Sequence, residues 1–151
     1  LTTFARDISL ISQEDYLKLA PPASISRFPA DLADRNLEYS GIYEDGWISE
    51  RAFFTLASKP DTRYLLIKGM VPQIDKPDFR STLAVSIDGK EVIKHPLGLG
   101  NFEIKVPVSG NGQRQRVDLA FDRHQVLPGA DLRPAGGKID FIGFVSDAAP
   151  K

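Results

Sequence analysis

The chain has 151 residues, a formal net charge of −1, and 26% charged residues of both signs. This length fits one domain, and the lack of a basic excess argues against nucleic acid as a partner. No apolar run approaches the roughly 18 residues of a membrane-spanning helix. The absence of cysteine excludes disulfides, thiolate nucleophiles and cysteine zinc sites.

Residues 1–38 differ from the rest and predict a mostly irregular N-terminal arm. A short helix is expected over residues 12–19, because Ser12 can cap exposed helix amides and Pro21-Pro22 ends the helix. Residues 31–34 predict another single turn. We expect the arm to pack on the following domain through Phe4, Ile8, Leu10 and Phe28, the alternative being a linker from an upstream domain.

From Tyr39 onward the chain is a series of short strands separated by turn residues. Apolar and polar residues alternate strictly in 81–88, 101–108 and 115–122, which indicates strands with one buried face. Strands at this spacing predict an all-β, antiparallel two-sheet β-sandwich over residues 39–148. The predicted strands are 39–43, 51–57, 63–71, 81–88, 91–95, 101–108, 115–122 and 138–146.

Two of these strands have sequences typical of the middle of a sheet. Residues 63–70 and 139–145 are almost continuously apolar, which predicts central strands covered on both faces. Gly69 and Gly143 inside them indicate bulges or close backbone approach. Asp88-Gly89 predicts a two-residue hairpin turn, because both residues tolerate positive φ.

Most candidate binding residues fall in three loops, 44–47, 72–80 and 122–137. Tyr43, just before the first loop, and Asp45 and Trp47 within it combine aromatic rings with a carboxylate, which suits stacking on a sugar and hydrogen bonding to its hydroxyls. The alternative is that Trp47 packs on the edge of the core and holds the turn.

The long third loop offers a carboxylate and a guanidinium two residues apart, Asp131 and Arg133. They could grip a polar ligand, with arginine presenting a planar fork, or form an ion pair that fixes the loop before the last strand. Arg51, Asp78 and Arg80 could join either arrangement.

The sequence contains no motif that specifies a reaction, and we expect no enzyme activity. His124 lies in the third loop, but no spacing typical of a metal site or of a general base accompanies it, so it enters only as a ligand-binding candidate. No cofactor is predicted. Calcium is the one conceivable metal, on Asp45, Asp75 and Asp78, although these residues lack regular spacing.

The order of turns and strand cores after Tyr39 carries a family resemblance. The motifs are Gly41-Ile42-Tyr43-x-Asp45-Gly46-Trp47, Leu65-x-Ile67-x-Gly69, Val85-x-Ile87-Asp88-Gly89, Gly100-x-Phe102-x-Ile104-x-Val106-Pro107, Asp131-x-Arg133 and Ile139-x-x-Ile142-Gly143. Over about two-thirds of the chain they resemble the accessory β-sandwich domains of bacterial surface-polysaccharide glycosyltransferases and related envelope proteins. They are similar also to galactose-binding-like carbohydrate-binding modules.

This resemblance implies a jelly-roll-like sandwich that recognises a glycan or oligosaccharide, with Asp45, Trp47, Asp131 and Arg133 as the positions to inspect. It favours an extracytoplasmic location, in the bacterial envelope or periplasm, and an upstream catalytic domain as a partner. The alternative function is a structural or protein-interaction module of such a protein. If the three loops converge at one end of the sandwich, a ligand site there is favoured.

Overall fold

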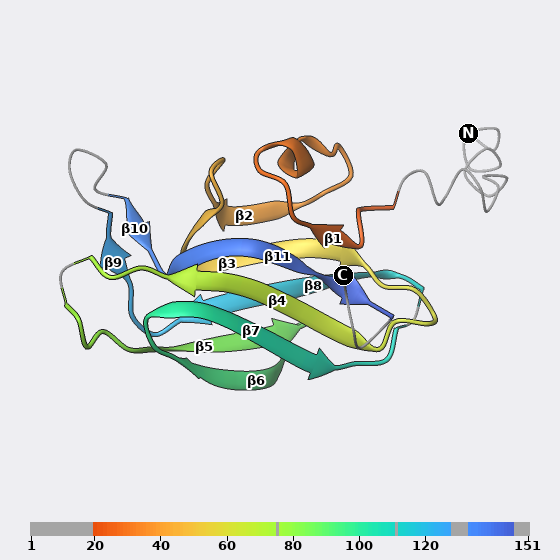
Figure 1. Cartoon of the computed structure of the whole chain (residues 1–151). Coiled ribbons are helices and arrows are strands. Elements are labelled where there is room, and N and C mark those ends of the chain that lie inside the picture. Colours follow the sequence, from red (N-terminus) through yellow and green to blue (C-terminus); the bar gives the residue numbers. More distant parts are fainter. Residues whose placement is uncertain (1–19, 75, 111, 128–132, 147–151) are drawn as a thin grey trace, which may run out of the picture.

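The computed structural model of the chain describes residues 20–74, 76–110, 112–127 and 133–146 (Figure 1). In this part every regular element is a strand except one 3-10 helix, Ala30–Ala33, so the predicted all-β class is confirmed. The strands are β1 (Ser24–Ile25), β2 (Tyr39–Ile42), β3 (Trp47–Ala57), β4 (Tyr64–Val71), β5 (Ser81–Ile87), β6 (Lys90–Leu97), β7 (Gly100–Pro107), β8 (Arg114–Phe121), β9 (Gln125–Val126), β10 (Pro134–Ala135) and β11 (Gly137–Val145).

The strands form one large, curled sheet and a small ribbon. Hydrogen bonds join seven strands in the order β6-β5-β8-β3-β11-β4-β7, and β1 and β2 add to β11 and β3. Every pair is antiparallel, as predicted. In Figure 1 the sheet curls so that β5 and β6 lie across from β11 and β4. Because β3 pairs with both β8 and β11, the predicted division into two jelly-roll sheets stays a prediction.

The inward side chains of the alternating strands fill the space inside the curl. β4 lies between β11 and β7, and β11 lies between β3 and β4, so both predicted central strands are central. A Cβ on Gly69 would collide with the carbonyl oxygen of Lys138, and one on Gly143 with Ser24, which confirms close approach at both glycines. Fully or almost fully buried core residues include Ile25, Ile48, Phe54, Leu56, Leu65, Ile67, Leu83, Val85, Ile104, Val117, Leu119 and Ile142.

The two strands at the ends of the sheet order, β6 and β7, expose charged residues and proline. β6 follows the predicted Asp88-Gly89 turn, in which φ is 51° and 84°, and it exposes Lys90, Glu91, Lys94 and Pro96. β7 exposes Lys105 and Pro107. Each of these strands pairs with only one neighbour in the order of the sheet.

The structure corrects several boundaries. β3 begins at Trp47, not at residue 51, and the two-residue strands β1, β9 and β10 were not predicted. Ile48 is buried whereas Glu50 and Arg51 are both exposed, so alternation fails at the start of β3 and hides it.

The N-terminal arm is only partly described. The predicted turn at 31–34 is found as the 3-10 helix, and Phe28 packs against the core. The predicted helix over 12–19 and the contacts of Phe4, Ile8 and Leu10 lie outside the described residues. The boundary between arm and sandwich at residue 38 stays a prediction.

The described residues of the three candidate loops lie at the same end of the fold, on the left in Figure 1. The first and third are joined by an ion pair between Asp45 and Arg133. The second and third are joined where Gln125 Nε2 donates to the carbonyl oxygen of Pro72 at 2.8 Å. In the part of the chain that the structure describes, no helix has the length and apolar character needed to cross a membrane.

Candidate functional site

The hairpin between β2 and β3 holds Tyr43, Asp45 and Trp47 in a tight loop. The carbonyl oxygen of Tyr43 accepts from Gly46 N–H at 2.9 Å, and that of Trp47 accepts from Tyr43 N–H at 2.8 Å. Gly46 has a φ of 92°, which a glycine adopts without strain and which a three-residue hairpin loop commonly requires. The Asp-Gly sequence thus determines the hairpin conformation, and with it the positions of the Asp45 and Trp47 side chains.

Asp45 and Arg133 form a bidentate pair across 88 positions of sequence. Arg133 Nη2 lies 2.8 Å from Asp45 Oδ2, and Nη1 lies 3.3 Å from Oδ1. The side-chain hydrogen bond from Arg133 is the main reason that the pKa of Asp45 lies below its usual range. The Asp45 side chain is 50% exposed and that of Arg133 29% exposed, so the pair sits at the surface.

Tyr43 completes this contact. The Arg133 guanidinium carbon lies 4.5 Å from the centre of the Tyr43 ring, and the Tyr43 hydroxyl donates to the carbonyl oxygen of Pro134 at 3.4 Å. The hairpin is therefore joined to β10 by a salt bridge, a cation–π contact and a hydrogen bond.

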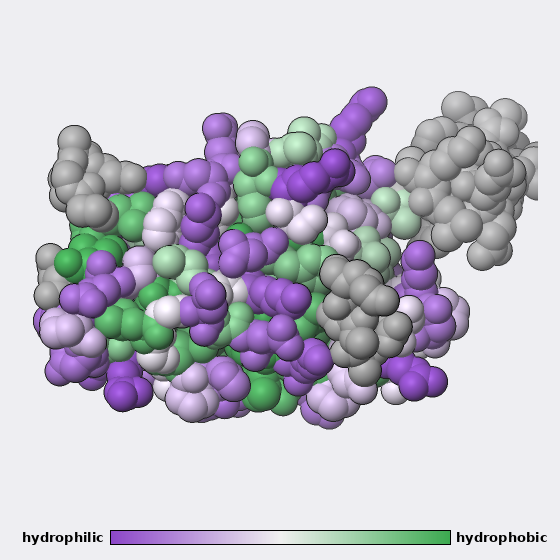
Figure 2. Space-filling view, in the orientation of Figure 1, coloured by the Kyte–Doolittle hydropathy of each residue, from purple (hydrophilic) through white to green (hydrophobic). Residues whose placement is uncertain are grey.

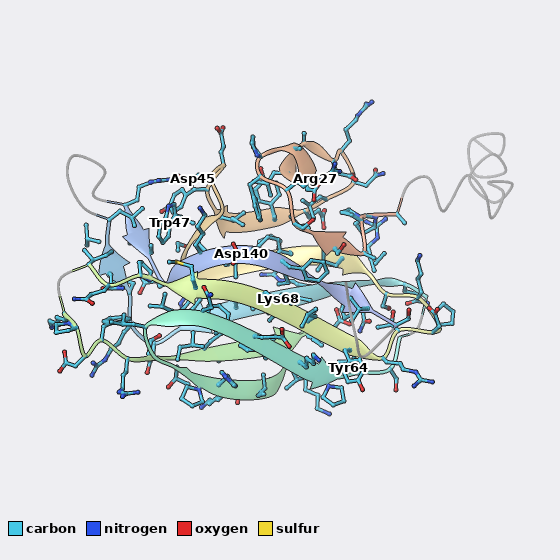
Figure 3. All side chains as sticks on the ribbon, viewed as in Figure 1. Arg27, Asp45, Trp47, Tyr64, Lys68 and Asp140 are labelled. Atoms are coloured by element: carbon cyan, nitrogen blue, oxygen red, sulfur yellow. The ribbon has the colours of Figure 1, made fainter. Side chains whose placement is uncertain are left out.

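Trp47 lies half-buried at the first position of β3, near Asp45 (Figure 3). Its backbone N–H donates to Asp45 Oδ1 at 3.5 Å. Lys138, its cross-strand partner on β11, places its ammonium 5.8 Å from the centre of the indole ring. Trp47 as a residue is partly exposed.

A second group of candidates lines a hollow of about 620 Å³ at the same end. Here His124 Nδ1 lies 3.1 Å from Glu50 Oε2. Asp122 Oδ1 accepts from the backbone N–H of Thr82 at 2.7 Å, which fixes the start of the third loop against β5. The lining residues are Glu50, Lys76, Asp78, Phe79, Asp122, Arg123 and His124.

The two groups lie on either side of the β9–β10 ribbon. Pro134 pairs with Val126 and Ala135 with Gln125, so Arg133 and His124 stand at opposite ends of the ribbon. The structure thus brings Tyr43, Asp45, Trp47 and Arg133 together, and places Asp78 and His124 in the neighbouring hollow. Arg80 is in neither group and extends beside Gly98. Asp131 lies outside the described residues.

No cluster of three or more His, Asp or Glu side chains suited to a metal occurs within residues 20–74, 76–110, 112–127 and 133–146. Of the residues considered for calcium, Asp45 is paired with Arg133 and Asp78 lies in the hollow, while Asp75 is outside the described part. A calcium site stays a prediction.

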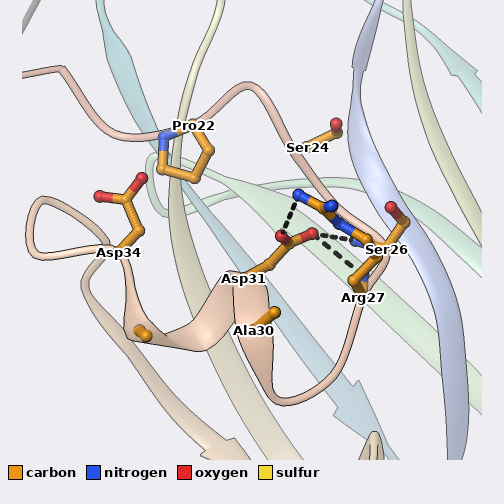
Figure 4. Close-up of a pocket in the computed structure, with 8 residues that line it drawn as sticks. Pro22, Ser24, Ser26, Arg27, Ala30, Asp31 and Asp34 are labelled. Atoms are coloured by element: carbon orange, nitrogen blue, oxygen red, sulfur yellow. Dashed lines mark hydrogen bonds and ion pairs between the residues drawn. The ribbon is translucent and has the colours of Figure 1, made fainter.

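Sequence reasoning missed a polar hollow of about 740 Å³ in the arm, lined by Pro22, Ser24, Ser26, Arg27, Ala30, Asp31, Ala33 and Asp34 (Figure 4). Asp31 accepts from the backbone N–H groups of Ser26 at 2.9 Å and Arg27 at 3.0 Å, and from Arg27 Nη2 at 3.3 Å. The bond from Ser26 N–H is the largest cause of the lowered pKa of Asp31. The aspartate shortly after a serine and a proline was the available signal, since Asp commonly bonds nearby backbone groups.

Sequence reasoning also left out Glu50 and Lys138. The partners of both come from distant parts of the chain, so no local motif identifies them.

No protein-family model and no curated protein matches the chain. Among solved structures, an exo-β-1,3-galactanase from Phanerochaete chrysosporium matches at 10% identity and a TM-score of 0.45, over 83% of this chain and 29% of that one. A CBM35 from Paenibacillus barcinonensis matches at 11% identity and a TM-score of 0.41, over 83% of this chain and 90% of that one. Structural similarity this distant does not indicate a ligand for this chain.

Proposed function

We propose that this chain is a non-catalytic carbohydrate-binding domain with a jelly-roll-like frame. It recognises a glycan at the end of the fold where the three loops meet. The observation that carries the proposal is the convergence itself, since loops far apart in sequence bring a partly exposed tryptophan and a set of polar side chains to one end. Rigid sheets commonly present binding residues on loops in this way.

The side chains around Trp47 and those that line the hollow beside His124 are of the kinds that bind sugars. The Trp47 ring offers an apolar surface for the C–H face of a pyranose, and an indole also buries a large area on contact. In the adjoining hollow, Lys76, Asp78 and Arg123 make no ion pair with other described residues and are exposed. They remain available to donate to and accept from hydroxyl groups.

The sequence resemblance extends the proposal to the whole protein. We propose that the domain is an accessory part of a bacterial surface-polysaccharide glycosyltransferase or related envelope protein, that it lies outside the cytoplasm, and that it works beside an upstream catalytic domain. The full-length gene tests this part, because a product without an adjoining catalytic or membrane segment contradicts it.

A glycan array followed by isothermal titration tests the binding function. We expect Trp47→Ala to weaken the strongest array interaction about tenfold, which equals about 1.4 kcal/mol. Tyr39→Ala is the matched control, because Tyr39 is a partly exposed aromatic at the opposite end of β2. No binding of any saccharide at millimolar concentration, or equal losses in both variants, contradicts the proposal.

A second candidate is a structural or protein-interaction module, favoured by exposed apolar surface at the loop end. Val126 on β9 is 46% exposed, and Figure 2 shows hydrophobic residues gathered at the end of the molecule where β9 and β10 lie. Trp47 fluorescence separates the two functions. A shift on adding oligosaccharides supports sugar binding, whereas no shift together with a mass that rises with protein concentration supports self-association.

A further inference from the structure

We infer that Asp45, Arg133 and Tyr43 form a clasp that positions the Trp47 hairpin against the β9–β10 ribbon, and that Asp45 and Arg133 act as positioning residues instead of direct ligand contacts. This inference rests on the proposed function, and it reassigns two of the residues that the sequence offers as sugar-binding groups. The name "clasp" is used below for these three residues.

The polar atoms of the clasp are already engaged with each other. Both oxygens of Asp45 face the two terminal nitrogens of Arg133, at 2.8 and 3.3 Å. One face of the guanidinium lies on the Tyr43 ring, at 4.5 Å. A ligand that used the fork of Arg133 for a bidentate contact would have to displace Asp45, and bidentate arginine–carboxylate pairs are among the stronger polar contacts.

The clasp adds side-chain contacts to the backbone bonds that join the hairpin to the sheet. At this end β3 pairs with β11 at only two positions, through Ile48 and Trp47. The same ladder continues into the hairpin, where Ile139 N–H of β11 donates to the carbonyl oxygen of Gly46 at 3.0 Å. Gly136 N–H, just after the ribbon, also donates to the carbonyl oxygen of Ile48 at 2.8 Å, and the clasp adds the Arg133 salt bridge and the hydrogen bond to the Pro134 carbonyl.

Trp47 follows Asp45 by two residues. The Trp47 backbone N–H donates to the same Asp45 oxygen that faces Arg133 Nη1. A change in the direction of the Asp45 carboxylate is therefore transmitted to the strand residue that carries the indole ring. The clasp thus acts on the ligand through Trp47.

The test uses the single tryptophan of the chain as the reporter. Acrylamide quenching and the emission maximum of Trp47 are measured in the wild-type protein, Asp45→Ala, Arg133→Ala and the reversed pair Asp45→Arg/Arg133→Asp. Arg133→Lys, which keeps the charge but loses the fork, serves if an alanine variant does not fold. Affinity for the strongest array saccharide of the wild-type protein is measured on the same samples.

We expect both alanine variants to show stronger quenching, a shift of emission to longer wavelength and affinity about tenfold lower, corresponding to about 1.4 kcal/mol. The reversed pair should restore part of both signals, because it rebuilds the ion pair but lacks the acceptor for Trp47 N–H and the cation on the Tyr43 ring. The matched control is Asp118→Ala, which breaks another exposed bidentate arginine–aspartate pair. Arg116 lies 2.8 Å from Asp118 and stacks on Phe53 at 3.9 Å, and the change should leave Trp47 unaffected.

Three results overturn the inference. Unchanged quenching in Asp45→Ala and Arg133→Ala shows that the clasp does not position Trp47. A reversed pair that restores quenching but not affinity shows that Asp45 or Arg133 contacts the ligand directly. An equal effect of Asp118→Ala shows general destabilisation. If the wild-type protein binds no saccharide, the proposed function fails, and the quenching data alone still decide whether the clasp positions Trp47.

Discussion

Replacing Gly69 with alanine should destabilise the fold strongly, although it adds only one methyl group. Gly69 lies in β4, where its cross-strand partners are Ile139 on β11 and Phe102 on β7. The added Cβ would overlap the carbonyl oxygen of Lys138 and lie 2.8 Å from Phe102 Cζ. The Phe102 ring can turn away, but the carbonyl oxygen belongs to a strand that is paired on both sides.

The expected cost follows from these two contacts. Overpacking a core usually costs about 1–3 kcal/mol, and a clash with backbone belongs at the upper end of that range. We therefore expect a loss of about 3 kcal/mol, which at about 2–4 °C per kcal/mol lowers Tm by roughly 6–12 °C. A domain with about 5–15 kcal/mol of stability remains folded after this loss.

Urea unfolding followed by circular dichroism measures the effect, with Gly98→Ala as the matched control. The Cβ of Gly98→Ala would meet only Arg80 Nη1, at 3.7 Å, and Gly98 is not among the glycines with positive φ. The control should be neutral, or stabilised by up to about 1 kcal/mol. A Gly69→Ala protein within about 0.5 kcal/mol of wild type would refute the reasoning, because surface changes have that size.

Three further predictions concern Asp31 in the arm, the Asp88-Gly89 hairpin turn and the stability of the protein at low pH. The Asp31 side chain is 18% exposed and accepts three hydrogen bonds, all of which Asp31→Ala removes. The free energy of unfolding in urea should fall by about 1–2 kcal/mol, and an unchanged value contradicts a structural role for Asp31. Gly89→Val should cost about 1 kcal/mol, since φ at Gly89 is 84° although its surroundings are open. The lowered pKa values of Asp31 and Asp45 imply a contribution to stability that is present above their unfolded pKa, about 3.9, and lost as pH falls through the lower folded values. Urea midpoints between pH 7 and pH 2.5 should therefore fall most below pH 4, and less in Asp31→Asn; a flat profile speaks against both assignments.

Period-two alternation was sufficient to predict the larger strands, because a half-buried strand must alternate. It failed where the geometry is irregular or the element is short. At the start of β3, Glu50 and Arg51 are exposed in succession, and the pairing register with β2 shifts between Ser40 and Ile42, which breaks the alternation. β1, β9 and β10 have two residues each, too few to show any period.

The candidate site was predictable as a set of loops but not as a set of contacts. Tyr43, Asp45 and Trp47 could be grouped because one hairpin carries them. The partner of Asp45 could not be predicted, since Arg133 is 88 positions away and only the order of strands brings it near. The same holds for Glu50 and His124, which are 74 positions apart.

The two strands at the ends of the sheet have a consequence for behaviour at high concentration. An unpaired strand edge is a template on which another molecule can add a strand, the first step toward aggregation. β6 places Lys90 and Lys94 along its length, and β6 and β7 contain Pro96 and Pro107, which have no backbone N–H to donate. Exposed charges such as Lys90, Glu91 and Lys94 and a proline on each strand disfavour such pairing, so we expect a nearly closed sheet that still has two edges to resist polymerising through them.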